Sequence, residues 1–249
     1  MKGEKRIKWI LLFAAAVFLI AGGAGVFFFP YVTDLMYKQD VQKQKESFVQ
    51  QLPQIKETET EESQPAETLP FEELYQELNQ QNILLFQEKQ KNLLDPFSYE
   101  RQGIDLTAYG LEDNTIGFLW IPKMDVELPI LLGATIDNMR IGAVHMTETS
   151  YPIGGNNTNC VIAAHRGYSK TAMFRDIELL ELGDLVYIQN FRETLTYQVV
   201  EIQGIDPTDI ESCLIQADRD LVTLLTCHPY GHNYQRYLVF CQRAEPQQE

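Results

Sequence analysis

Three patterns of apolar and polar residues divide the chain, and each predicts a different kind of element. Residues 9–29 form an uncharged apolar run of 21 residues, which is long enough to cross a bilayer as a helix. Residues 71–92 carry apolar side chains at near-helical spacing, without Gly or Pro, which predicts an amphipathic helix packed on a domain. From about residue 115 onward, short apolar segments are separated by turn residues, a pattern typical of β-strands.

This third region predicts a mainly β domain. Its strand-like segments are residues 117–121, 126–132, 161–164, 185–188, 195–202, 221–226 and 237–241. A helix is predicted over residues 171–182. Seven or eight short strands with few helices favour a closed β-barrel. A region of about 130 to 150 residues is large enough to bury a core of its own.

The apolar run near the N-terminus predicts a membrane anchor. Basic residues precede it at positions 2, 5, 6 and 8, so the positive-inside rule leaves the N-terminus in the cytoplasm and the rest outside the cell. A cleaved signal peptide is the alternative, although the run continues through Phe29, beyond its small residues. We therefore divide the chain into a cytoplasmic N-terminus (1–8), an anchor (9–29), a solvated, acidic and partly helical stalk (30–70), a helix and loop region (71–115) and a barrel (116–249).

The formal net charge of −15 narrows the range of partners. Residues 1–29 hold four basic residues and one acidic residue, so the part expected outside the membrane carries −18. Such a charge argues against nucleic acid and anionic lipid as partners. It mildly favours a basic or lysine-presenting substrate, although a surface that is acidic only for solubility is the preferred interpretation.

Four cysteines raise the question of disulfides and metals. If Cys227 lies opposite Arg236 in a hairpin, Cys241 lies opposite residue 222, some five residues along the strand from Cys227 and beyond disulfide reach. Cys160 and Cys241 fall in apolar segments and Cys213 in a loop, which favours small buried side chains. No Cys-x-x-Cys motif is present, so we expect neither a zinc site nor any other cofactor.

The hairpin around Cys227 carries the candidate chemistry. Residues 223, 225 and 227 share one face of a predicted strand by the two-residue period. Turn formers follow at 229, 231 and 233, and Arg236 begins the returning strand. This arrangement predicts a guanidinium beside the Cys227 sulfur. A thiol next to a fixed cation ionises more readily, and the thiolate is the nucleophile.

This segment resembles the signature of sortases, the cysteine transpeptidases of the Gram-positive cell surface. The Thr-Leu-x-Thr-Cys motif of that family matches residues 223–227, and its partner arginine matches Arg236. The family's catalytic histidine matches His165, which follows an apolar segment and precedes Arg-Gly. His145, His228 and His232 are competitors for that role, and Arg166 is a weaker alternative to Arg236. The resemblance implies an eight-stranded sortase-type barrel over roughly residues 93–243.

Two features are most similar to class C, the pilin-polymerising branch. The first is the spacing from Cys227 through Pro, Tyr, Gly and Asn to Arg236. The second is the loop Asp95, Pro96 and Phe97, which is similar to the Asp-Pro-aromatic lid of class C enzymes. Pro96 ends any helix and restricts the residue before it. As a lid, this loop would pair Asp95 with Arg236 and bury Phe97 near Cys227.

The resemblance implies a membrane-anchored transpeptidase. Cys227 would attack the backbone of a Leu-Pro-x-Thr-Gly-like sorting signal, His165 would act as acid and then base, and Arg236 would hold the oxyanion. The thioacyl group would pass to an amine, which in class C is typically a pilin lysine. The alternatives are a sortase that anchors proteins to cell-wall peptide, a cysteine hydrolase without transfer, and a membrane-tethered binding module.

Overall fold

The computed structural model describes residues 2–52, 71–91, 93, 103–167, 171–209 and 211–244. Eight strands form a closed barrel in the order β1-β2-β3-β4-β7-β8-β6-β5. Neighbouring strands are antiparallel except for two parallel pairs, β2 with β3 and β4 with β7. The strands are β1 Thr115–Ile121, β2 Val126–Leu132, β3 Ala143–His145, β4 Thr158–Ala163, β5 Leu185–Asn190, β6 Thr194–Ile205, β7 Asp220–His228 and β8 Gln235–Arg243.

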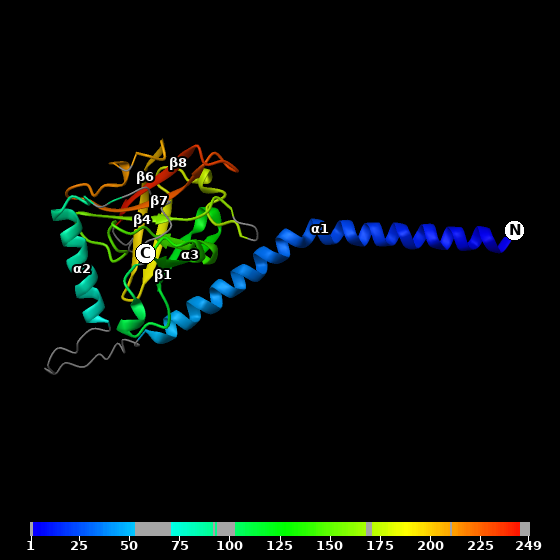
Figure 1. The fold of residues 1–249 in the computed structure, drawn as a ribbon, viewed down its shortest axis with the longest axis horizontal. Helices are drawn as coiled ribbons and strands as arrows, with labels where there is room; N and C mark the ends of the chain where they lie inside the picture. Colours follow the sequence, from blue (N-terminus) through cyan, green and yellow to red (C-terminus); the bar gives the residue numbers. More distant parts are fainter. Residues whose placement is uncertain are drawn as a thin grey trace.

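The helices lie outside this barrel (Figure 1). They are α1 Lys2–Gln51, α2 Glu72–Gln87 and α3 Ile136–Ile141. Short 3-10 helices occur at η1 Leu106–Tyr109, η2 Pro122–Met124, η3 Ile177–Leu179 and η4 Glu211–Cys213. The predicted closed, mainly β barrel is therefore confirmed. The amphipathic helix predicted at residues 71–92 is present as α2, with Leu74 and Leu78 fully buried.

Apolar side chains on the two faces of the barrel wall form two clusters. The interior cluster includes cross-strand partners such as Cys160, Val222 and Cys241. The outer cluster includes Ala163, Leu225, Leu238 and Phe240 from β4, β7 and β8, and Cys213 from the connection between β6 and β7. These strands are buried on both faces, because that connection covers the outside of the wall.

Two local predictions differ from the structure. The helix predicted over residues 171–182 is a series of turns with one 3-10 helix, η3. Met173 has a φ of 43°, in the left-handed region, which interrupts a right-handed helix. Phe174 N–H instead donates to His165 O at 3.0 Å. The strand missing from the prediction is β3, which has only three residues.

Helix α1 changes its surroundings along its length. Its first part projects away from the barrel and carries exposed apolar side chains, whereas the second part packs against the barrel (Figure 1). Val41 and Phe48 are buried there, and the rings of Phe48 and Phe118 lie 5.6 Å apart. The first part of the stalk, which we expected to be solvated, is therefore packed against the barrel. Residues 53–70 of that stalk lie outside the described residues.

Candidate active site

The β7–β8 hairpin places Cys227 directly opposite Arg236. Side chains of directly opposed residues in an antiparallel pair lie on the same face of the sheet. The intervening turn includes Gly231 with a φ of 78°, a conformation that glycine adopts without strain. The same register sets Cys241 opposite Val222, as predicted. The sequence pattern of the hairpin thus predicted its register correctly.

Arg236 is held by the backbone around it. Its Nη1 donates to Asn233 O at 3.0 Å and to Gln235 O at 3.1 Å. On the other side of β8, Arg236 pairs with Ile205 of β6. The residue is only 6% exposed. The guanidinium is therefore a permanent charge with limited freedom, located at the same strand end as the thiol.

His165 reaches this location from β4. Ala163 pairs in parallel with Leu225, so His165, two residues further on, aligns with Cys227. The alignment continues past the end of the strand, because Ala164 N–H donates to Leu225 O at 3.2 Å and the Thr226 hydroxyl donates to Ala164 O at 2.8 Å. The ends of β4, β7 and β8 thus carry His165, Cys227 and Arg236 to one edge of the barrel.

The environment of His165 is partly desolvated. The ring is half-buried, and this burial lowers the pKa of His165 below its ordinary value, because desolvation disfavours the imidazolium. Cys227 is also half-buried. Both groups therefore keep partial access to solvent, and Cys227 follows Leu225 of the outer cluster on the same face of β7.

The competing histidines lie elsewhere. His145 is buried on β3, where Nε2 lies 3.1 Å from both Thr149 O and Ser150 O, and burial lowers its pKa to about 4. His232 stacks on Tyr234 in the exposed turn. His228 is on the opposite face of β7 from Cys227, because successive strand residues alternate. Their positions leave His165 as the histidine that shares a face with Cys227.

The other three cysteines are buried. All four cysteines are free thiols. Burial raises the pKa of Cys213 to about 12, and it also raises the pKa of Cys160 and Cys241. Their interpretation as small buried side chains is confirmed. Cys227 differs from them in exposure and in having a cation opposite it.

Asp95, Pro96 and Phe97, which the sequence predicts to form a lid, lie outside the described residues. The chain just before them is well anchored, since Leu93 is buried in the outer cluster. Gln90 fixes this segment further, because its Nε2 donates to Glu148 O at 2.9 Å and its Oε1 accepts from Ile215 N at 2.6 Å. Leu93 thus lies in the cluster on the face that also carries Cys227.

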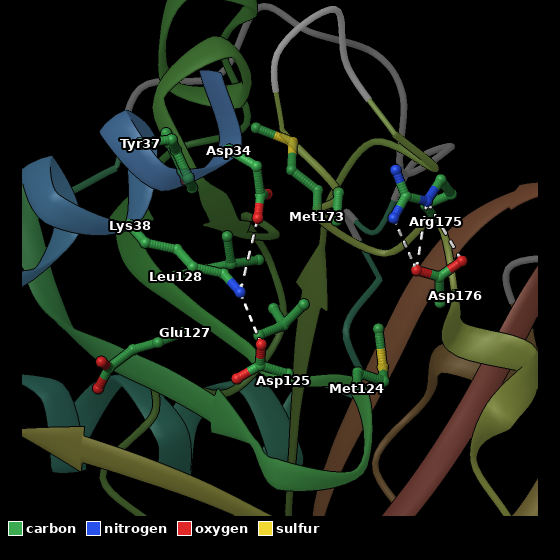
Figure 2. Close-up of a pocket in the computed structure, with 12 residues that line it drawn as sticks. Asp34, Tyr37, Lys38, Met124, Asp125, Glu127, Leu128, Met173, Arg175 and Asp176 are labelled. Carbon is green, nitrogen blue, oxygen red and sulfur yellow. Dashed lines mark hydrogen bonds and ion pairs between the residues drawn. The ribbon is translucent and has the colours of Figure 1, made fainter. Parts of the chain in front are cut away.

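A separate cavity of about 240 Å³ lies where α1 meets the barrel (Figure 2). Figure 2 shows Lys38 between Asp34 and Asp125, at 3.5 Å and 2.6 Å from their carboxylates. Hydrogen bonding to Asp125 is the main cause of the raised pKa of Lys38. The cavity lining contains none of the three candidate catalytic residues. We interpret it as part of the junction that joins α1 to the barrel.

Comparison with known proteins identifies the class. The sortase domain model matches residues 119–244, which is half of the chain. The chain therefore belongs to the sortase family. Among characterised relatives, sortase D of Bacillus subtilis is 30% identical over 131 residues, and sortase A of Bacillus anthracis is 31% identical over 126 residues. Each match covers 51% of this chain, but only 63% and 58% of the relative's length.

Solved structures of class C sortases are similar over a longer stretch. Sortase C1 of Streptococcus agalactiae has a TM-score of 0.67 at 28% identity, covering 74% of this chain and 95% of the other. Sortase C of Streptococcus pneumoniae has a TM-score of 0.62 at 30% identity, covering 82% and 97%. The neighbours thus include class C sortases, in agreement with the resemblance noted from the sequence.

Proposed function

We propose that this protein is a cysteine transpeptidase whose catalytic residues are Cys227, His165 and Arg236. The observation that carries the proposal is the convergence of β4, β7 and β8, which aligns His165 and Arg236 on either side of Cys227. A nucleophile, an acid–base group and a fixed cation on one face are the parts that acyl transfer requires. Membership of the sortase family supports the same assignment.

The reaction follows from these roles. The Cys227 thiolate attacks a backbone carbonyl, and Arg236 stabilises the negative oxygen that forms. As the carbon–nitrogen bond breaks, His165 in its protonated form donates a proton to the departing amine, which leaves a thioester on Cys227. An incoming amine then attacks the thioester and gives its proton to His165. The new amide leaves, and the thiolate and the imidazolium are restored.

We propose two substrates. One is a Leu-Pro-x-Thr-Gly-like sorting signal, and the other is an amine acceptor, which we propose to be a pilin lysine. The class C neighbours support this branch of the family. One of them, the sortase C of Streptococcus pneumoniae, is described as giving insight into pilin substrate specificity. We further propose that residues 9–29 anchor the enzyme in the membrane with the barrel outside the cell. The long apolar helix supports this, since its most apolar stretch has no buried residues.

We also propose that Asp95, Pro96 and Phe97 form a lid over the site. Leu93 supports this, since it belongs to the same outer cluster as Leu225 and Leu238, which precede Cys227 and follow Arg236 along their strands. Pro96 would present Asp95 and Phe97 together at low entropic cost. Opening of the lid would then precede substrate entry.

Product analysis tests the function directly. The full chain in detergent micelles is incubated with a Leu-Pro-x-Thr-Gly peptide and one of three acceptors: a lysine-bearing pilin peptide, a cell-wall peptide with a free amine, or none. Products are identified by mass spectrometry. The transpeptidase hypothesis predicts an amide-linked conjugate that forms only when the amine is present. Cleavage at the same rate without any conjugate would indicate a hydrolase. Conjugation only to a cell-wall peptide would indicate wall anchoring instead of pilus assembly.

A further inference from the structure

A second group of polar side chains lies directly behind the proposed catalytic pair. Arg166 follows His165, and His228 follows Cys227, so both point to the opposite face of the wall from the catalytic residues. Glu178 reaches them from η3. The function proposed above uses none of these three side chains. Their arrangement nevertheless joins the same two strand ends that carry the catalytic pair.

Arg166 is at the centre of this group. Its Nη2 lies 2.5 Å from Glu178 Oε2, and its Nη1 lies 2.6 Å from His228 Nδ1. The same Nη1 approaches Cys227 O at 3.5 Å. Glu178 Oε1 also lies 3.4 Å from His228 Nδ1. A planar guanidinium with several donors can hold these partners at once, which a lysine cannot.

Aromatic packing covers the group. The ring of Tyr237 on β8 stacks on His228 with centroids 5.3 Å apart, and the Arg166 guanidinium lies 5.8 Å from the Tyr237 centroid. The side chain of Arg166 is 4% exposed, whereas that of Glu178 is 53% exposed. The group therefore has a buried centre and one exposed member, which can be substituted without opening the core.

Arg166 lies just beyond the point where the backbone pairing of β4 with β7 ends. The regular pairing of β4 with β7 ends at Ala163 and Leu225, two residues before the catalytic pair. Beyond this point, the ends are joined by the hydrogen bonds of Ala164 and Thr226 and then by Arg166. Arg166 is thus the contact that extends the parallel register to the level of His165 and Cys227.

We propose that Arg166 is a positioning residue for the reaction. By holding His228, the Cys227 carbonyl and Glu178, it fixes the ends of β4 and β7 so that His165 and Cys227 remain aligned. The inference rests on the proposed function, because Arg166 would act on the rate only by keeping His165 and Cys227 aligned. It assigns Arg166 no contact with the substrate. Misalignment of reacting groups by about 1 Å costs on the order of a hundredfold in rate.

The experiment compares variants of the full chain in detergent micelles. Cleavage of a Leu-Pro-x-Thr-Gly peptide is measured as kcat and KM, with kcat expressed per Cys227 site titrated by a thiol reagent. For Arg166→Met we expect kcat per site to fall on the order of a hundredfold, with KM nearly unchanged. Glu178→Ala should show a smaller fall, and Glu178→Gln, which keeps an acceptor oxygen, should recover most of the loss. Glu181→Ala is the matched control, since Glu181 is exposed in the same segment but pairs with Lys123.

The outcomes separate this inference from the proposed function. Wild-type kcat per site in both Arg166→Met and Glu178→Ala would overturn the positioning role. A loss seen only as fewer titratable sites, each with normal kcat, would also overturn it, because it would indicate a structural role alone. Retained cleavage in Cys227→Ala would instead overturn the proposed function, and that variant is measured alongside. Arg166→Lys should give partial activity, because lysine keeps the positive charge but lacks the planar set of hydrogen-bond donors.

Discussion

The interior of the barrel and the open ends of β4 and β7 hold the same two reactive residue types in different environments. Cys241 and His145 are buried, and burial raises the pKa of Cys241 and lowers that of His145 to about 4, which disfavours the charged form of each. Cys227 and His165 are half-buried, and Cys227 lies opposite the cation of Arg236. The reactivity that we propose therefore belongs to the strand ends and not to the barrel interior. Substitutions at the two locations test this difference, from the largest expected effect to the smallest.

Replacing Cys227 with Ala should abolish both cleavage and transfer. Alanine removes the proposed nucleophile, and the half-buried position leaves the packing of β7 nearly unchanged. Mass spectrometry of the thioacyl enzyme, trapped with a sorting-signal peptide, should find the adduct on Cys227 in the wild-type chain. Cys241→Ala is the control and should keep its activity. An adduct on Cys160, Cys213 or Cys241 would contradict the assignment.

Replacing His165 with Ala should also reduce turnover to background. The variant keeps the Cys227 thiol but has no group that donates a proton to the leaving amine. Single-turnover measurements of thioester formation provide the test. If thioester forms at the wild-type rate and only transfer fails, His165 acts in the second step alone.

Replacing Arg236 with Lys should lower kcat on the order of a hundredfold, the usual effect of losing one oxyanion donor. Lysine keeps the positive charge but cannot reproduce the planar donors that Asn233 O and Gln235 O now hold in place. Steady-state kinetics and a melting temperature, measured together, separate a catalytic effect from unfolding. Wild-type kinetics would remove Arg236 from the site.

The interior histidine makes the stability of the protein depend on pH. The pKa of His145 is about 4 in the folded chain and 6.5 in the reference state, so the unfolded chain binds a proton more readily. This contribution to stability is fully present above about pH 6.5, is lost as pH falls toward 4, and changes no further below that. Its full size is on the order of 3 kcal/mol. His165 acts in the same direction, because burial lowers its pKa as well.

Urea unfolding at several pH values between 4 and 7 measures this effect. His145→Gln, which can still donate to the carbonyls of Thr149 and Ser150, should flatten the pH dependence relative to the wild-type chain. The difference between the two curves isolates His145 from the carboxylates that titrate in the same range. Parallel curves would mean that His145 is not the group responsible.

The sequence predicted local features better than contacts between distant segments. The alternation of residues 223–227 and the turn after them were enough to pair Cys227 with Arg236. The alignment of His165 with Cys227 depends on parallel pairing of β4 with β7, which periodicity does not encode, so there the family motif was needed. Glu178 was missed because its segment has the residue pattern of a helix, which the left-handed backbone at Met173 interrupts.

The docking of α1 was also missed, although a signal was present. Tyr37, Val41 and Phe48 recur at helical spacing within an otherwise polar segment, and such a stripe indicates a packed face. The abundance of charged residues outweighed this stripe and led to the prediction of a solvated stalk. In the structure, charged side chains serve the contact itself, since Lys38 pairs with Asp125 and Lys45 with Glu127.

The smallest expected effect concerns the lid, which remains a prediction. If Asp95 and Phe97 cover Cys227, replacing both with Ala should increase the rate of Cys227 alkylation several-fold, because the thiol is then reached without lid opening. Buried Cys241 in the same chain is an internal control, and its rate should not change. Peptide mapping after timed alkylation measures both rates together. An unchanged Cys227 rate would indicate that the loop packs elsewhere, and a rise at Cys241 as well would indicate general loosening of the barrel.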